Sequence, residues 1–336
     1  MRLRRRLLLA AAAASLAAPA LAEAGRFAAA ARYSAERRGV SLLVLREGRV
    51  LFEDYPNEGG PDRAFELASG TKSFCGPLLA AAAAEGLIGP AEPCAAVLPE
   101  WRGDPAKSRI TPLLLLTLTG GFPPGRLRPP GYAEAVAASL SSAPGERFAY
   151  GPVPFQIFGE MLRRRLAARG LPPDPVAYLQ SRLLDRLSVR PGAWRRGRDG
   201  NPLLPQGAAF TACGWGAFGE AVRRAETEGL RGLDPAVVAA LFRGTRANPG
   251  YGLTWWLAEP GLVAPGRGQG LEGLSAGGLA AERIAFAAGA GYQRLYLLRR
   301  RGVVVVRQAS GIAAALAGRG PAWNDAAFLR LLAEAL

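Results

Sequence analysis

Apolar residues follow strand-like patterns near both ends of the chain. Val40 to Tyr55 contains two short apolar runs separated by an Arg-Glu-Gly turn, which is typical of a β-hairpin. Three further extended runs, 283–287, 293–298 and 303–307, follow one another closely, and an arginine–glycine turn joins the last two. We therefore expect strands at the beginning and at the end of the chain.

The middle of the chain has mainly helical patterns, broken by loops rich in proline and glycine. Ser69 to Glu85 is rich in alanine and leucine and predicts a helix that ends at Gly86. From about residue 90 to 265 the pattern is mostly helical. The clearest other helices are 156–168, 235–243 and a closing amphipathic segment that begins at Asn324 or Asp325 and reaches Leu336.

Strands at both ends with helices between them indicate an α+β fold. We predict one antiparallel sheet formed from both chain ends, flanked by helices, with a mainly helical region inserted. The α/β part would comprise about 23–85 and 270–336, and the helical part about 86–269. Because no repeat or flexible linker separates these parts, we expect them to form a single domain, 23–336.

The first 22 residues have the features of an export signal. Four arginines precede a short apolar stretch, and Ala20-Leu21-Ala22 supplies a small-x-small cleavage pattern, which predicts a signal peptide over 1–22. The alternative is an uncleaved anchor, although the stretch is short and alanine-rich for a membrane span. No later stretch is long and apolar enough to span a bilayer. We expect a periplasmic or secreted protein without a stable span after cleavage.

The formal net charge of +15 reflects arginine used almost everywhere in place of lysine. Attraction to anionic envelope polymers, lipid headgroups or nucleic acid is the alternative explanation. The arginines are dispersed and no nucleic-acid-binding motif accompanies them, so we expect no nucleic-acid partner. A hydrophobic content of 49 % excludes a disordered chain and fits one that buries a large core.

The chain contains no histidine, which removes every Ser-His-Asp and Cys-His scheme. The Gly-Leu-Ser-Ala-Gly stretch at 273–277 is therefore not interpreted as a nucleophile elbow. A Gly-x-Gly-x-x-Gly pattern at 268–273 follows no clear strand and is interpreted as a loop. Three cysteines without a Cys-x-x-Cys pair leave at least one thiol free. We expect neither a metal site nor a cofactor.

Ser69 and Lys72 are the most informative candidates for catalysis. Three positions apart on a predicted helix, they share one face. A serine hydroxyl needs a base, and burial can lower a lysine pKa from about 10.4 by roughly 3–5 units. Lysine occurs only twice in this arginine-rich chain, and arginine stays protonated and cannot serve as the base. The alternative is an ordinary helix start with a solvated lysine.

Several stretches around this pair share their sequence and their order with one protein family. They are Phe65–Phe74, Ala84–Ile88, Val97–Trp101, Ile110–Gly121, Pro144–Tyr150, Gly250–Trp256 and Ala287–Gln293. The chain thus resembles the β-lactamase-related serine hydrolases, which include class C β-lactamases, D-alanyl-D-alanine peptidases, serine esterases and 6-aminohexanoate-oligomer hydrolases. The resemblance extends from about residue 36 to the C-terminus and implies a β-lactamase/DD-peptidase-like fold.

The resemblance also implies a role for each matching residue. Ser69 would be the acylated nucleophile, Lys72 its proton partner, and Tyr150 a second general base or acid near the leaving group. The backbone N–H groups of Ser69 and Ala290 would form the oxyanion hole. Residues implied to contact the substrate are Gly289, Gly291, Tyr292 and Trp255. The alternatives for Tyr150 and Ala290 are a buried aromatic side chain and ordinary strand backbone.

The chain departs from the family pattern at polar positions. Pro152 stands where the second motif has asparagine, and Ala287 where the third motif begins with lysine or histidine. Leu118 and Gly120 replace a histidine and a serine of another family segment. Loss of the cation at 287 argues against a β-lactam or D-alanine carboxylate and favours an ester or a neutral amide. Arg294 is a candidate substitute, but its side of the strand is not evident from the sequence.

These observations predict an exported serine hydrolase that cleaves a small ester, amide or peptidoglycan-like substrate through a Ser69 acyl-enzyme. The first alternative is a catalytically degenerate relative that binds an envelope ligand without turnover. The missing polar groups favour this alternative, whereas the intact Ser69, Lys72 and Tyr150 set opposes it. The second alternative, a basic module that binds anionic polymer, depends only on net charge. The natural substrate, the first proton acceptor and the oligomeric state stay open.

Overall fold

The computed structural model of the protein describes residues 25–125, 128–258 and 277–336. The predicted signal peptide, 1–22, lies outside these described residues, as do the glycine-rich pattern at 268–273 and nearly all of the one at 273–277. In the described part of the chain, no helix combines the length and the apolar character needed to cross a bilayer. The boundaries predicted for the two parts of the domain stay a prediction.

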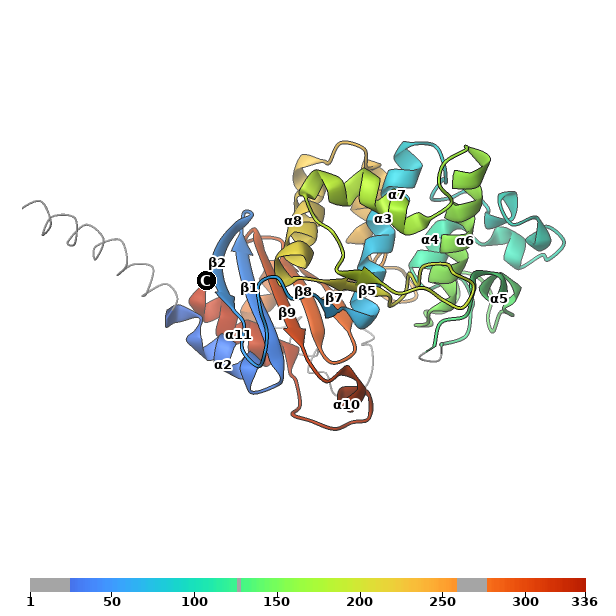
Figure 1. The fold of residues 1–336 in the computed structure, drawn as a ribbon. Helices are drawn as coiled ribbons and strands as arrows, with labels where there is room; N and C mark the ends of the chain where they lie inside the picture. The colour runs from blue at the N-terminus through green and yellow to red at the C-terminus, as the bar shows by residue number, and fades with distance from the viewer. Residues whose placement is uncertain (1–24, 126–127, 259–276) are drawn as a thin grey trace, which may run out of the picture.

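A six-stranded antiparallel sheet unites the two ends of the chain, as predicted (Figure 1). Its spatial order is β2-β1-β9-β8-β7-β6, so the last strand of the chain pairs with the first. The strands are β1 (Gly39–Arg46), β2 (Arg49–Asp54), β6 (Trp256–Leu257), β7 (Ile284–Gly289), β8 (Gln293–Leu298) and β9 (Val303–Ala309). Glu47 and Gly48 join β1 to β2 with φ of 47° and 76°, the left-handed geometry of tight hairpins.

Helices cover both faces of this sheet. Helix α8 (Ala212–Glu228) packs on one face, where a Cβ on Gly219 would lie 2.7 Å from Cδ1 of Leu295. The glycine thus allows the helix to approach the sheet closely. On the other face lie α2 (Ala28–Ala35) and α11 (Asp325–Ala335). These first and last helices of the described chain pack together in one layer.

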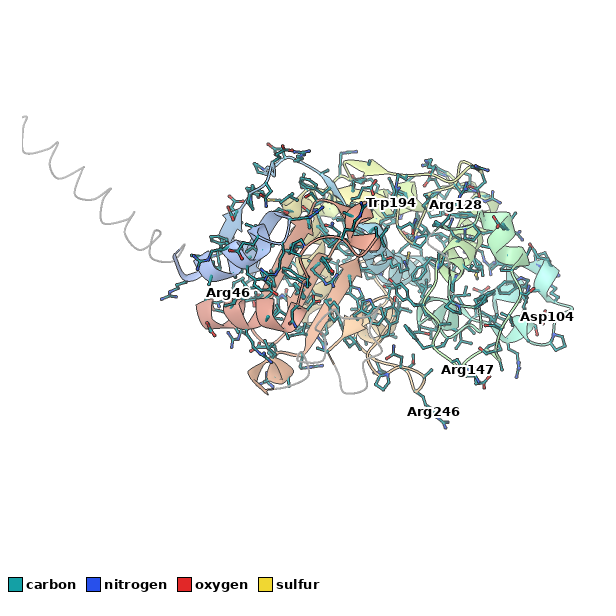
Figure 2. All side chains as sticks on the ribbon, turned by 90° about the horizontal axis from the view of Figure 1, so that it is seen from below. Arg46, Asp104, Arg128, Arg147, Trp194 and Arg246 are labelled. Atoms are coloured by element: carbon teal, nitrogen blue, oxygen red, sulfur yellow. The ribbon has the colours of Figure 1, made fainter. Side chains whose placement is uncertain are left out.

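Most of the remaining helices gather beside the sheet (Figure 1). They are α3 (Cys75–Ala84), α4 (Pro112–Leu116), α5 (Tyr132–Ala137), α6 (Val153–Ala168), α7 (Pro175–Leu179) and α9 (Pro235–Leu241). A short helix α10 (Ile312–Leu316) follows β9. Figure 2 shows side chains filling the molecule from Arg46 at the sheet end to Asp104 at the helical end.

The helix expected over 69–85 consists of two different parts. A 3₁₀ helix, η1 (Ala68–Phe74), precedes α3. Pro77 has no N–H to donate to the preceding turn, and the hydroxyls of Thr71 and Ser73 donate to the carbonyls of Ala68 and Gly70 at 2.7 Å. The tighter helix therefore coincides with the residues that carry the candidate chemistry.

A second, small sheet connects η1 to the loop before α8. Its strands β3 (Phe65–Glu66), β5 (Ala208–Phe210) and β4 (Ala193–Trp194) pair antiparallel in the order β3-β5-β4. The N–H of Leu67 continues the pairing by donating to the carbonyl of Ala208 at 2.9 Å. This sheet therefore holds the start of η1 beside residues 202–208.

Candidate active site

Ser69 and Lys72 are in direct contact on η1. The Nζ of Lys72 lies 3.0 Å from Oγ of Ser69 and 3.0 Å from the carbonyl oxygen of Pro205. Ser69 is half-buried, whereas Lys72 has only 4 % of its surface exposed. The alternative of a solvated lysine at an ordinary helix start is therefore wrong for this structure.

The residue before the nucleophile has a strained backbone. Ala68 has φ of 46°, a conformation that costs a non-glycine residue about 1–3 kcal/mol. Thr71 stabilises it, because its hydroxyl donates to the Ala68 carbonyl and accepts from the N–H of Ala208 at 3.2 Å. The local geometry around Ser69 is thus determined jointly by η1 and strand β5.

Burial lowers the pKa of Lys72 to about 7. Its ammonium nitrogen lies 4.9 Å from the ring centre of Tyr150 and 5.4 Å from that of Phe155, contacts that favour the charged form. Desolvation outweighs these contacts and the opposing electrostatic influence of Cys75. A large fraction of Lys72 is therefore neutral near pH 7 and able to accept a proton.

Tyr150 lies beside Ser69 and Lys72, and its pKa is shifted in the opposite direction to that of Lys72. The carbonyl of Leu118 accepts from the N–H of Ala149, and the Tyr150 ring centre lies 5.4 Å from that of Trp256. Burial raises the pKa of Tyr150 to about 12, while a hydrogen bond with Ser69 and the charge of Arg294 act to lower it. The phenol is therefore protonated at neutral pH and suited to donate a proton.

The end of strand β7 packs directly against the nucleophile segment. A Cβ on Gly289 would lie 2.0 Å from the carbonyl oxygen of Leu67 and 3.1 Å from the N of Gly70, so only glycine fits there. Ala290 follows at once and is half-buried. Ser69 and Ala290, the two predicted oxyanion-hole residues, thus belong to backbone segments in contact.

The other residues expected to contact a substrate have different surroundings. Gly291, with φ of 74°, is buried against Ile312, and the half-buried Tyr292 stacks on Trp323 with ring centres 6.5 Å apart. These residues therefore shape the turn after β7, and of this pair only Tyr292 is partly exposed.

Trp255 is completely buried, which corrects its expected place at the site. Its ring packs between Phe218 and Phe242, with ring centres 6.3 Å away in each case. The neighbouring Trp256 is the tryptophan that packs on Tyr150. Successive side chains along an extended segment point to opposite sides, so only one of the two can face the site.

Arg294 does not fill the space of the cation that is missing at position 287. In the β7–β8 pairing it lies opposite Ala288, whereas Ala287 lies opposite Leu295 and shares the other face of the sheet. The guanidinium of Arg294 instead binds Asp325 of α11, from Nε at 2.7 Å and from Nη2 at 3.1 Å. The sequence left open which face of β8 carries Arg294; the structure places it on the face opposite to Ala287.

The sequence predicts a loop at 190–206 but gives no sign that its carbonyl at Pro205 is the second partner of Lys72. Side chains from four separate elements hold this loop. Gln156 accepts from the N–H of Leu204 at 3.2 Å, Tyr132 donates to Pro202 at 3.1 Å, Trp194 donates to Leu203 at 3.2 Å, and Thr71 binds Ala208. Because the functional group is a main-chain carbonyl, no residue type marks it in the sequence.

A hollow of about 930 Å³ lies next to this loop and to the backbone after Tyr150. Its wall includes Gly125, Pro152 and Leu203, and the N–H of Gly125 donates to the carbonyl of Tyr150 at 3.2 Å.

None of the three cysteines is paired, and no metal-binding cluster of His, Cys, Asp or Glu occurs in the described part of the chain.

Comparisons with known proteins identify the family and the fold of the chain. The family model described as Beta-lactamase matches residues 26–311. A Bacteroides dorei protein provisionally described as a β-lactamase has a TM-score of 0.69 at 21 % identity, over 89 % of this chain and 94 % of that one. EstCE1, described as a hydrolase with promiscuous acyltransferase activity, has 0.66 at 15 % identity, over 94 % and 99 %.

The β-lactamase/D-alanine carboxypeptidase of Pseudomonas syringae has a TM-score of 0.64 at 16 % identity, over 94 % of this chain and 98 % of that one. At such identities the likeness concerns the fold. A search of curated protein sequences returned no match.

Proposed function

This chain belongs to the β-lactamase family, whose members are generally serine hydrolases, and we propose that it cleaves a small ester or amide through an acyl-enzyme on Ser69. The observation that carries the proposal is the 3.0 Å contact between Lys72 Nζ and Ser69 Oγ, at a lysine whose pKa burial lowers to about 7. A chain without histidine thereby has a base in contact with its candidate nucleophile.

Acylation begins when neutral Lys72 accepts the proton of the Ser69 hydroxyl. The freed oxygen attacks the substrate carbonyl, and the N–H groups of Ser69 and Ala290 stabilise the oxyanion that forms. The phenol of Tyr150 then donates a proton to the leaving alcohol or amine and regains one from Lys72. The opposite pKa shifts of Lys72 and Tyr150 support this order, in which lysine is the first acceptor.

Deacylation uses the same groups in the reverse order. A water molecule attacks the acyl carbon while the Lys72–Tyr150 pair accepts its proton, and the departing Ser69 oxygen recovers a proton from Lys72. The enzyme returns to its starting protonation state, so no cofactor is consumed.

The surroundings favour an ester or a neutral amide over a carboxylate-bearing substrate. Ala287 supplies no cation on the face of β7 that lies toward Ser69, and Pro152 offers no side-chain hydrogen bond. A peptidoglycan-like fragment is the third substrate class to compare.

Labelling by a fluorophosphonate probe tests the nucleophile. We expect one label per chain on Ser69, none in Ser69→Ala, and full labelling in Ser73→Ala, whose hydroxyl instead donates to Gly70. Turnover of p-nitrophenyl esters compared with a chromogenic cephalosporin then reports the substrate class, with the esters preferred. Absence of a label on the folded protein would contradict the proposal.

The second candidate is a relative that binds an envelope ligand without turnover. The absent asparagine at Pro152 and the absent cation at Ala287 favour it. Stoichiometric labelling of Ser69 without turnover of any ester, amide or muropeptide would support this candidate over the enzyme.

We also propose export with cleavage after Ala22, supported by the arginine-led apolar start of the sequence. Mass spectrometry of the mature protein from a cell-envelope fraction tests this proposal. Recovery of the chain with its N-terminus intact in the cytoplasm would contradict it.

A further inference from the structure

Two buried arginines lie behind the turn that joins β7 to β8. Arg294 is 1 % exposed and Arg307 is completely buried. Asp325, also buried, forms a two-pronged ion pair with Arg294 and accepts a hydrogen bond from Tyr296. Arg307 instead stacks on Trp323, at 4.2 Å from the ring centre, and no carboxylate of the described residues lies within ion-pair distance of it.

Both guanidinium groups donate to the main chain of the turn. Nη1 of Arg294 lies 3.3 Å from the carbonyl of Gly289 and 3.1 Å from that of Gln293. Nη1 of Arg307 lies 2.9 Å from the carbonyl of Tyr292 and 3.5 Å from that of Gly291. Four of the five carbonyl groups of residues 289–293 therefore point toward a buried cation on one side of the turn.

This arrangement orients the peptide group that contains the Ala290 N–H. The carbonyl of Gly289 and the N–H of Ala290 belong to the same trans peptide, so they point in opposite directions. Because Arg294, on β8, donates to that carbonyl, the Ala290 N–H points away from Arg294 and from β8. The Cα of Gly289 packs against Leu67 and Gly70 on the side of Ser69. A charged donor on the carbonyl also strengthens the N–H as a donor.

Among the described residues of this cluster, the two guanidinium groups share one carboxylate, that of Asp325. Burial lowers the pKa of Arg307 to about 9, although the nearby Tyr296 and Asp325 act to raise it. The remaining contacts of Arg307 are neutral: the hydroxyl and carbonyl of Ser34 and the carbonyl of Arg37. Little of this charge is screened by water, so the cluster creates a positive potential at the turn.

We propose that Arg294 and Arg307 are positioning residues for the oxyanion turn, and that their charge replaces, from the opposite face of β7, the cation missing at Ala287. This inference rests on the proposed Ser69 acyl-enzyme function. It explains how the chain keeps a positive potential beside Ser69 without a cationic side chain that would also bind a substrate carboxylate. Neither arginine touches the substrate in this scheme.

Lysine substitutions test the proposal, because lysine lacks the planar fork of donors that holds the turn and, when buried, loses its proton more readily than arginine. We expect Arg294→Lys and Arg307→Lys to slow acylation by p-nitrophenyl esters on the order of 10-fold to 100-fold, with little change in KM. Arg223→Lys is the matched control, because Arg223 is also a buried arginine, bound to Glu220 and Glu47 away from the turn. Folded Arg294→Lys and Arg307→Lys proteins with wild-type acylation rates would overturn the proposal.

Amide hydrogen exchange supplies a readout that does not require turnover. We expect the amides of residues 289–293 to exchange about tenfold faster in Arg307→Lys than in wild type, and unchanged in Arg223→Lys. Unchanged exchange at the turn in Arg307→Lys would overturn the positioning role. Failure of the proposed function has a different signature: the wild-type protein takes no fluorophosphonate label while the turn amides still respond.

Discussion

The carbonyl oxygen of Pro205 lies 3.0 Å from the side-chain nitrogen of Lys72, 133 positions earlier in the chain. When the amine is neutral, it donates a hydrogen to this carbonyl and can direct its lone pair toward Ser69, which lies 3.0 Å away on another side. A main-chain acceptor thus orients the proposed base. In this chain it does so without an asparagine at position 152.

The loop that carries this carbonyl depends on Gln156. We expect Gln156→Leu to lose about 1–3 kcal/mol of stability, because the N–H of Leu204 and the carbonyl of Pro130 lose their partner. Acylation should also slow, since Pro205 is displaced from Lys72. Urea unfolding and the rate of fluorophosphonate labelling measure the two effects. The control is Gln180→Leu, which loses bonds to Asp185 and Val189 and should leave labelling unchanged.

The activity should depend on pH through Lys72. Because burial lowers its pKa to about 7, kcat/KM for a neutral ester should rise as the pH increases through about 7 and then level off. Lys72→Arg should remove the activity, since a guanidinium stays protonated. A pH–rate profile that is flat between pH 5 and 9 would contradict Lys72 as the base; this range brackets the pKa of about 7.

The buried amine of Lys72 should lower the free energy of unfolding at pH values below its ordinary pKa of 10.5. The unfolded chain binds a proton on Lys72 up to about pH 10.5, whereas the folded protein releases it near pH 7, so the penalty is full below pH 7 and fades as the pH rises toward 10.5. Lys72→Met should therefore be more stable than wild type by about 1–4 kcal/mol at pH 7.

The gain in the Lys72→Met protein should shrink as the pH increases from 7 to 10. This window follows from the folded value of about 7 and the ordinary value of 10.5. Thermal unfolding at several pH values measures it, with Lys107→Met as the control because Lys107 is only half-buried. A stability gain of Lys72→Met that increases with pH would contradict the lowered pKa of Lys72.

The contact between β7 and the nucleophile segment requires glycine at position 289. We expect Gly289→Ala to destabilise the protein by about 1–3 kcal/mol or more and to abolish labelling of Ser69, because the added methyl group overlaps the Leu67 carbonyl. Gly278→Ala is the control, since no atom of the described residues lies within 4 Å of the Cβ that it adds. Wild-type labelling by the Gly289→Ala protein would show that β7 does not form the oxyanion hole as proposed.

The sequence by itself determined the elements that depend on local patterns. The hairpin at 40–55, the strands near 284–309 and the closing helix from Asn324 all lie where alternation, turns and capping residues predict them. Ser69 and Lys72 were also evident, because a spacing of three on a helix brings side chains together whatever surrounds them. The absence of histidine, a property of composition alone, limited the chemistry to bases other than imidazole.

Only the tertiary structure decided which distant groups meet these residues. The burial that lowers the pKa of Lys72, the Pro205 carbonyl beside it and the Arg294–Asp325 pair behind β7 all come from elements far apart in the chain. The choice of Trp256 over Trp255 beside Tyr150 depends on how one strand is turned. Main-chain carbonyls are the same in every residue, and the direction of a strand's faces is set by what packs on them, so neither leaves a mark in the sequence.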